Sequence, residues 1–192
     1  MHEQIRALLS WQAPNLEQAQ LAPASIAANT PELINHYRLQ LPHLRPGFYD
    51  KLTRADQARL DGLLVGVLLL DGLLSLPESL QQNLPLRLAA DDMAEYQFTH
   101  QHVLDQRVDF ATRMMIEKTG KRSRDLLQAG ALLGNPWFSG WRYRLLIART
   151  EQWLRLVQTR PEILFYSSNA LTTKDMLMIK LRVFWRVLSK QA

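Results

Sequence analysis

Cysteine is absent from this sequence, which excludes disulfide bonds and thiolate metal sites. Long apolar runs are also missing: Asp61 and Asp71 bound the most hydrophobic window and leave nine uncharged residues, Gly62 to Leu70, between them. A helix needs about 20 such residues to span a bilayer. The N-terminal residues contain no continuous apolar block of the kind found in secretory signals. These features predict a cytoplasmic protein in which residues 62–70 belong to a buried core helix.

Catalytic motifs are scarce as well. The glycines are too scattered to form a phosphate-binding loop, and no Gly-x-Ser-x-Gly elbow or helical His-Glu zinc motif is present. The stretch Asp91-Asp92-Met93-Ala94-Glu95 resembles the acidic Mg-diphosphate motif of isoprenoid synthases. No second acidic motif follows it, and the helix dipole alone favours acids at a helix start. We therefore predict no enzymatic activity, no metal and no cofactor, with a small helical lipid or diphosphate enzyme as an alternative.

A histidine pair close to this stretch does not suggest a metal site either. His100 and His102 stand two apart in a segment predicted to be helical, so they point about 200° away from each other and cannot chelate one ion. Asp105 and Asp109 share a helix face, and His102 lies one turn before Asp105. A solvated helix surface accounts for these residues.

Charge is divided unevenly along the chain. Residues 1–112 carry 8 Lys and Arg against 13 Asp and Glu, a net charge of −5, whereas residues 113–192 carry 15 against 5, a net charge of +10. Such a division lets the two halves attract each other in the fold, or lets the second half face an acidic protein, nucleic acid or anionic lipid. A solvated charge bias without a function also fits.

Helical periodicity dominates the sequence and predicts an all-α fold. We expect helices at residues 3–12, 31–40, 54–75, 77–83, 91–119, 123–133, 137–159 and 173–189. Gly120 is placed to end the longest helix, and Ser123 to cap the helix after it. Only residues 162–166 have the composition of a strand. The chain is predicted to form a single compact multi-helix domain over residues 1–192, with a loop-rich, proline-containing arm at 1–52 wrapping a helical core at 53–192.

Five arginines lie in or beside the helix expected at 137–159. At about 100° per residue, Arg142, Arg149 and Arg160 share one side, whereas Arg144 and Arg155 lie nearly opposite. They do not form one stripe, and no helix-turn-helix or RNA-binding motif accompanies them. We therefore predict no nucleic-acid binding, with a basic helical nucleic-acid-associated regulator as the alternative function.

The last predicted helix combines a core-facing stripe with an apolar outer side. The stripe consists of Leu177, Leu181, Phe184 and Leu188. Met178 and Trp185 lie on the outer side among basic residues, an arrangement typical of an interaction surface. A neighbouring segment such as the N-terminal arm could cover them instead, and a membrane-surface helix is a third option.

Trp153 lies about 40° from the side that carries Arg142 and Arg149, so we expect it to supply an apolar anchor there. The residues expected to bind a protein partner are Arg142, Arg149, Trp153, Met178, Arg182, Trp185 and Arg186.

Residues 125–136 read DLLQAGALLGNP and place two glycines, Gly130 and Gly134, four apart in an apolar helical segment. Glycine in a helix interior costs about 1 kcal/mol relative to alanine, and close helix packing is the usual compensation. Gly62 and Gly66 have the same spacing. The helix that contains them is therefore the expected partner of this segment.

The same segment carries a family resemblance. Asp125, Leu126, Gly130, Ala131, Leu132, Leu133, Gly134 and Pro136, followed by the aromatic cluster Trp137, Phe138 and Trp141, resemble a segment of the SctK family of type III secretion systems (OrgA, MxiK and PscK types). A fainter similarity lies in residues 45–49, RPGFY, although this stretch comes later than in the family. The motif is structural, not catalytic.

The resemblance implies a non-enzymatic adaptor of the cytoplasmic sorting platform. Such a protein links the pods built from SctQ and SctL to the inner-membrane ring protein SctD. It implies an all-helical protein with an SctQ-like pod protein and an SctD-like ring protein as partners. The protein would associate peripherally with the secretion apparatus at the inner membrane, without inserting into the bilayer.

Overall fold

The computed structural model describes residues 29–44, 52–83, 86–134 and 140–165, together with Met178 and Leu181. These residues form helices and connecting turns and contain no strand, which confirms the all-α fold class. The elements are α2 (Thr30–Leu44), α4 (Arg54–Leu74), α5 (Leu76–Gln81), α6 (Ala90–Glu95), α7 (His100–Leu104), α8 (Phe110–Ala129), the 3-10 helix η1 (Ala131–Gly134), α9 (Trp141–Thr159) and the 3-10 helix η2 (Pro161–Leu164).

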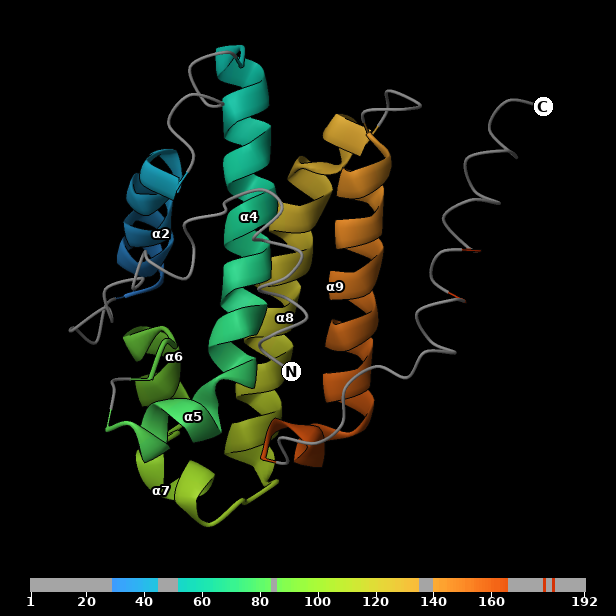
Figure 1. Ribbon diagram of the computed structural model, residues 1–192. Helices are drawn as coiled ribbons and strands as arrows, with labels where there is room; N and C mark the ends of the chain where they lie inside the picture. The colour runs from blue at the N-terminus through green and yellow to red at the C-terminus, as the bar shows by residue number, and fades with distance from the viewer. Residues whose placement is uncertain are drawn as a thin grey trace.

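Helix α4 forms the centre of the molecule. Every residue from Gly62 to Leu74 is buried, as the apolar window predicted. Figure 1 shows why: α2 lies on one side of α4, and α8 and α9 lie on the other. The helix begins where its N-cap indicates, because the Thr53 side chain accepts a hydrogen bond from the backbone N–H of Asp56. Its bounds match the predicted 54–75 to within one residue.

Small residues allow α4 and α8 to approach each other closely. A Cβ atom on Gly66 would lie 2.9 Å from the Ser123 carbonyl oxygen, and one on Gly130 would lie 2.6 Å from Leu63 Cβ. The predicted packing of the Gly62–Gly66 helix against the segment around Gly130 is therefore confirmed. Gly134 is different, because its close neighbour is the side chain of Arg144 in α9.

The single helix expected at 91–119 is wrong. The chain instead forms α6, α7 and the first half of α8, separated by turns in which Gln97 and Gln106 adopt positive φ angles of 54° and 52°. Thr99 and Asp109 act as the N-caps of α7 and α8. The hydrogen bonds between Thr99 and His102 and between Asp109 and Thr112 thus stabilise the starts of two separate helices.

Helix α8 runs without interruption through the predicted break at Gly120 and Ser123. Gly120 is buried inside α8 and lies beside Leu154 and Gln158 of α9. The Ser123 hydroxyl donates to the Gly66 carbonyl at 2.6 Å instead of capping a helix. The predicted helix at 123–133 is therefore the end of α8 followed by η1.

The remaining expectations have mixed outcomes. Helices predicted at 31–40, 77–83 and 137–159 occur as α2, α5 and α9 with shifted ends. Residues 162–165, part of the stretch with the composition of a strand, form no strand, because the 3-10 helix η2 begins at Pro161. The helix expected at 3–12 lies outside the described residues, as does most of the one expected at 173–189, of which Met178 and Leu181 are both helical.

The N-terminal arm contributes to the core, which its loop-rich composition did not predict. Leu33, Tyr37 and Leu41 lie one turn apart along α2 and are each at most 2% exposed. They belong to the same apolar cluster as α4, α8 and α9. Residues 30–41 are thus part of the hydrophobic core.

Candidate interaction surface

Helix α9 carries two of the arginines expected to bind a partner. Arg142 is exposed in its first turn, and Arg149 is half-buried two turns later. Burial lowers the pKa of the Arg149 guanidinium below its ordinary value. Arg144, on another side of the helix, donates its Nε–H to the Gly134 carbonyl oxygen and so fixes the turn before α9.

The expectation that Trp153 forms an apolar anchor on this surface is wrong. Its side chain is 1% exposed, and it lies on the side of α9 that also buries Leu146, Thr150 and Val157. That side packs against α8 and α4. An angle of 40° from the arginines was too small a difference to decide which side of the helix faces the core.

Two leucines place apolar surface beside these arginines instead. Leu145 and Leu156 are half-buried at the margin of the core. At about 100° per residue, both lie within about 60° of Arg142 and Arg149. Both leucines pack against the edge of the core and remain partly exposed, as does Arg149 between them.

The C-terminal candidates are described only in part. Met178 is 54% exposed, in agreement with its expected outer position. Leu181 was expected to face the core, yet 44% of its surface is exposed. Arg182, Trp185 and Arg186 lie outside the described residues.

The acidic stretch at 91–95 connects α6 to two neighbouring helices. Asp92 is buried and forms a bidentate ion pair with Arg122 of α8. Asp91 Oδ1 accepts hydrogen bonds from the Thr30 backbone N–H at 3.1 Å and from its hydroxyl at 2.9 Å. Glu95 lies 3.6 Å from Lys118 Nζ. Each carboxylate thus has a protein partner, as expected for a structural ion-pair cluster.

The electrostatics of these groups follow from their partners. Burial alone would raise the pKa of Asp91, but the two Thr30 donors, the Asp92 backbone N–H and the Arg122 charge together hold this pKa below its ordinary value. Burial would lower the pKa of Arg122, but the hydrogen-bonded Asp92 carboxylate raises it. Both groups are therefore stabilised in their charged forms.

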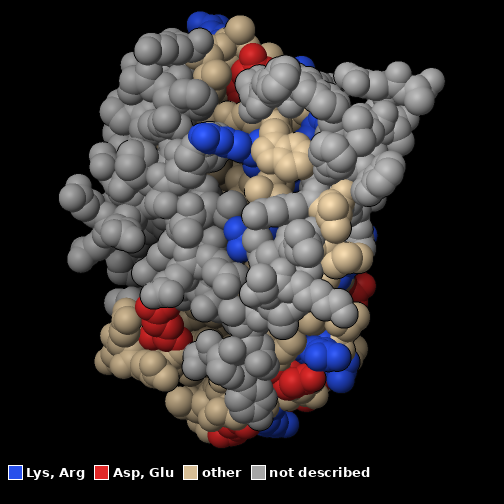
Figure 2. Space-filling view, turned by 45° about the vertical axis from the view of Figure 1, so that its right-hand side comes forward, with Lys and Arg blue, Asp and Glu red and all other residues tan. Residues whose placement is uncertain are grey.

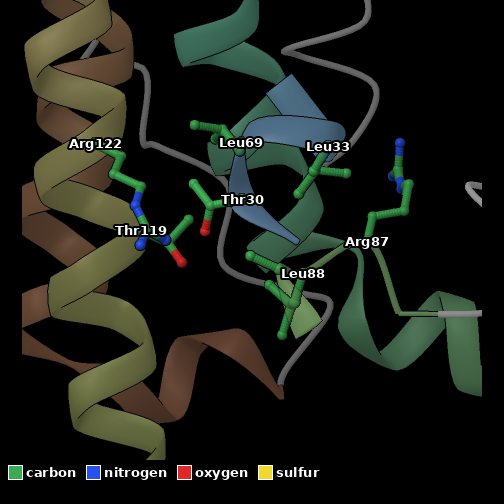
Figure 3. Close-up of a pocket in the computed structure, with 8 residues that line it drawn as sticks. Thr30, Leu33, Leu69, Arg87, Leu88, Thr119 and Arg122 are labelled. Atoms are coloured by element: carbon green, nitrogen blue, oxygen red, sulfur yellow. The ribbon is translucent and has the colours of Figure 1, made fainter. Parts of the chain in front are cut away.

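A small cavity adjoins this cluster. Its volume is about 10 Å³, room for about one water molecule, and Leu33, Leu69 and Leu88 line it together with polar groups. Figure 3 shows Arg122 and Thr119 extending from α8 toward Thr30, with Arg87 lying apart from them. A cavity of this size is too small for a diphosphate group, so the resemblance of residues 91–95 to a Mg-diphosphate motif gains no support here.

His102 and Asp109 organise the turn between α7 and α8. His102 Nδ1 accepts the Thr99 backbone N–H at 3.1 Å, and its Nε2 lies 3.4 Å from Asp109 Oδ2. Burial would raise the pKa of Asp109, but the Thr112 N–H, His102 and Arg107 lower it below its ordinary value. These side chains, expected to be solvated, instead close a turn.

Neither a metal site nor a membrane span is found among the described residues. No group of three or more His, Asp and Glu side chains in them is arranged to hold a metal ion. No helix in that part of the chain combines the length and apolar character needed to cross a bilayer. Figure 2 shows the Lys and Arg atoms of the coloured residues as separate patches on the face presented, not as one continuous field.

Comparison of the chain with protein-family models, with curated proteins and with solved structures found no match in any of the three.

Proposed function

We propose that this protein is a non-enzymatic adaptor of the cytoplasmic sorting platform of a type III secretion system. In this role it links an SctQ/SctL pod to the SctD-like inner-membrane ring protein, at the cytoplasmic face of the inner membrane. The observation that carries the proposal is the resemblance of residues 125–136, with the aromatic residues after them, to a segment of the SctK family.

The local structure is compatible with a structural role for this segment. Gly130 ends α8 against α4, η1 follows, and Gly134 packs under Arg144 at the start of α9. The 3-10 helix η1 thus contacts α9, the helix that carries Arg142 and Arg149. We therefore infer that the residues that resemble the SctK family help to position α9 for binding a partner.

The partner surface of the proposed adaptor combines Arg142 and Arg149 with Leu145 and Leu156. Arginine is enriched at protein interfaces, and the fully buried core of an interface is more apolar than the rest of the protein surface. Met178, which is 54% exposed, is the described member of the C-terminal candidates, which also include Arg182, Trp185 and Arg186. The partner face would then carry carboxylates.

Co-purification from the bacterium that makes the protein tests this proposal. Tagged wild type is expected to recover the pod and inner-ring proteins at moderate salt. Charge reversal by Arg142→Glu, or by Arg182→Glu with Arg186→Glu, should reduce that recovery. Lys121→Glu is the matched control, because Lys121 is an exposed cation on the neighbouring helix α8.

Failure of the wild type to recover any secretion component would overturn the adaptor function. Recovery of nucleic acid with an affinity that falls steeply with salt would favour the regulator instead. If wild type and all the charge-reversed variants recovered the secretion components equally, the adaptor function would stand, but the proposed partner surface would be refuted.

A further inference from the structure

The small cavity beside the Asp91–Asp92 cluster lies where several segments of the fold meet. The residues that line it come from α2 (Thr30 and Leu33), α4 (Leu69), the segment before α6 (Arg87, Leu88 and Ala89) and α8 (Thr119 and Arg122). Its wall is therefore partly apolar and partly polar. A volume of about 10 Å³ admits about one water molecule and excludes larger ligands.

The Thr119 side chain brings an unsatisfied polar group to this cavity. Thr119 is only 6% exposed, and its hydroxyl forms no hydrogen bond with any of the described residues. Other buried hydroxyls of the fold do have partners, since those of Ser123 and Thr150 each donate to a backbone carbonyl. A buried hydroxyl without a partner is costly and rare in native proteins. Because Thr119 borders the cavity, a molecule inside the cavity is the partner within its reach.

Further polar groups border the cavity on both sides. The Thr30 hydroxyl donates to Asp91 Oδ1 at 2.9 Å, so its oxygen can still accept a hydrogen bond. Arg122 binds Asp92 through its two terminal nitrogens, and its Nε–H forms no hydrogen bond with a described residue. Figure 3 shows Thr119 and Arg122 directed from α8 toward Thr30 of α2. Together these groups offer the two to four hydrogen bonds that a buried water requires.

We propose that this cavity binds one ordered water molecule, which links the Thr119 hydroxyl of α8 to the Thr30 hydroxyl of α2. The water accepts a hydrogen bond from Thr119 and donates one to Thr30 Oγ1. Helix α2 packs against α4 and α6 and lies across α4 from most of α8 (Figure 1). The water therefore provides a polar connection between two helices that are otherwise joined through their neighbours. This site does not depend on the proposed adaptor function.

A small ion fits the cavity less well than water. Both arginines that line it already face a carboxylate, Arg122 that of Asp92 and Arg87 that of Asp71 at 3.0 Å. An anion would find no uncompensated positive charge there, and a cation would meet two guanidinium groups. A water molecule carries no net charge, and it both donates and accepts hydrogen bonds, as the two hydroxyls require.

A crystal structure of the full chain tests the site directly. Density for one water is expected within about 2.5–3.0 Å of both Thr119 Oγ1 and Thr30 Oγ1. An empty cavity, a bound ion, or a water bonded to only one of the two hydroxyls would overturn the proposal. Thr119→Ser is the matched control, because it keeps the hydroxyl and should keep the water. Thr119→Val replaces the hydroxyl with a methyl group and should lose the water, so a water retained there would contradict the proposed contact.

Unfolding in urea provides a second test, because a hydrated and a dry cavity predict opposite results. If the water is bound, Thr119→Val removes a satisfied hydroxyl and should lower the urea midpoint by roughly 0.3–0.5 M. In a dry cavity the same change removes an unsatisfied hydroxyl, and the midpoint would stay equal or rise. Thr150→Val gives the reference for a satisfied buried hydroxyl, because Thr150 donates to the Leu146 carbonyl at 2.8 Å. A Thr119→Val midpoint at or above that of wild type would overturn the proposal.

Discussion

Gly130 and Gly120 both belong to the α8 region, but a methyl group added at each would meet different surroundings. At Gly130 it would lie 2.9 Å from the Arg59 carbonyl oxygen and 2.6 Å from Leu63 Cβ, so the backbone of α4 would have to move. At Gly120 its nearest neighbour is the flexible amide of Gln158, at 3.3 Å. Close packing therefore requires glycine at the first position much more strictly than at the second.

We expect Gly130→Ala to lower the free energy of unfolding by about 1–3 kcal/mol through overpacking, and Gly130→Leu to lower it further. Gly120→Ala should raise it by about 0.5–1 kcal/mol, because alanine is the better helix former. Urea titrations followed by circular dichroism measure both changes. A Gly130→Ala protein as stable as wild type would show that α4 and α8 can separate at little energetic cost.

Gln106 provides a second prediction at this scale. Its φ of 52° places a side chain in the left-handed region, which glycine adopts without a steric penalty. Gln106→Gly should therefore stabilise the protein by roughly 0.5–1 kcal/mol despite the greater entropy of the unfolded chain. Gln128→Gly, on the exposed side of α8, should instead destabilise by about 1 kcal/mol. If thermal melting showed both variants to be destabilised alike, the positive φ would carry no strain.

At the scale of elements, the Asp92–Arg122 pair joins α6 to α8. Removing one member leaves the other buried or half-buried without its counter-charge, so Asp92→Ala and Arg122→Ala should each cost about 3 kcal/mol. The double variant should lose clearly less than the sum, and a double-mutant cycle measures the difference. Glu95→Ala serves as the control, because the Glu95–Lys118 pair is more exposed to solvent and should contribute far less to stability. Additive losses would mean that the two charges do not interact.

Helix positions were predictable where the signals are local. Thr53 and Asp56 mark the start of α4, and an apolar run bounded by acids identifies it as a buried helix. The division of residues 91–119 was missed because its signals are less common: Thr99 pairs with His102, Asp109 pairs with Thr112, and glutamine takes the left-handed position. Both capping pairs can be found in the sequence if histidine and threonine are allowed, besides glutamate and glutamine, at the third position after the N-cap residue.

Other features depend on residues distant in sequence and could not be predicted locally. The Ser123 hydroxyl donates a hydrogen bond to the Gly66 carbonyl oxygen, 57 positions away in the sequence. The residues next to Ser123 do not reveal this partner, so the prediction that Ser123 caps a helix was wrong. Trp153 and Arg142 lie close together around α9, and only the packing of α8 and α4 decides which of them is buried. Arg142 is exposed, as its predicted role requires, whereas the burial of Trp153 rules it out as an apolar anchor at the surface.

For the whole molecule, part of the charge asymmetry is used within the fold. Lys118 and Arg122 belong to the basic half of the chain and contact Glu95 and Asp92 of the acidic half. Several explanations fit the uneven charge of the two halves of the chain. These two ion pairs directly support one of them, electrostatic attraction between the halves. The arginines of α9 belong to the same basic half, and they are the residues that the proposed function assigns to a partner.

The helices should also differ in how readily they open. Helix α4 is buried along most of its length by neighbours on both sides, whereas α2 is anchored by Leu33, Tyr37, Leu41 and the Thr30–Asp91 contact. The Tyr37 hydroxyl is buried without a hydrogen-bond partner in the described residues, and burial raises its pKa to about 12. An unsatisfied buried hydroxyl costs about 1–3 kcal/mol, so α2 is held less firmly than its apolar contacts alone would suggest.

Hydrogen exchange measured by mass spectrometry should therefore show α2 opening in a local transition, while α4 and α8 exchange only through global unfolding. Tyr37→Phe removes the buried hydroxyl and keeps the ring, so it should slow exchange in α2 and leave α4 unchanged. Asp91→Asn weakens the acceptor for Thr30 and should speed exchange in α2 alone. Equal protection of α2 and α4 in the wild type would mean that the Thr30–Asp91 contact and the three core residues suffice to make α2 part of one cooperative unit.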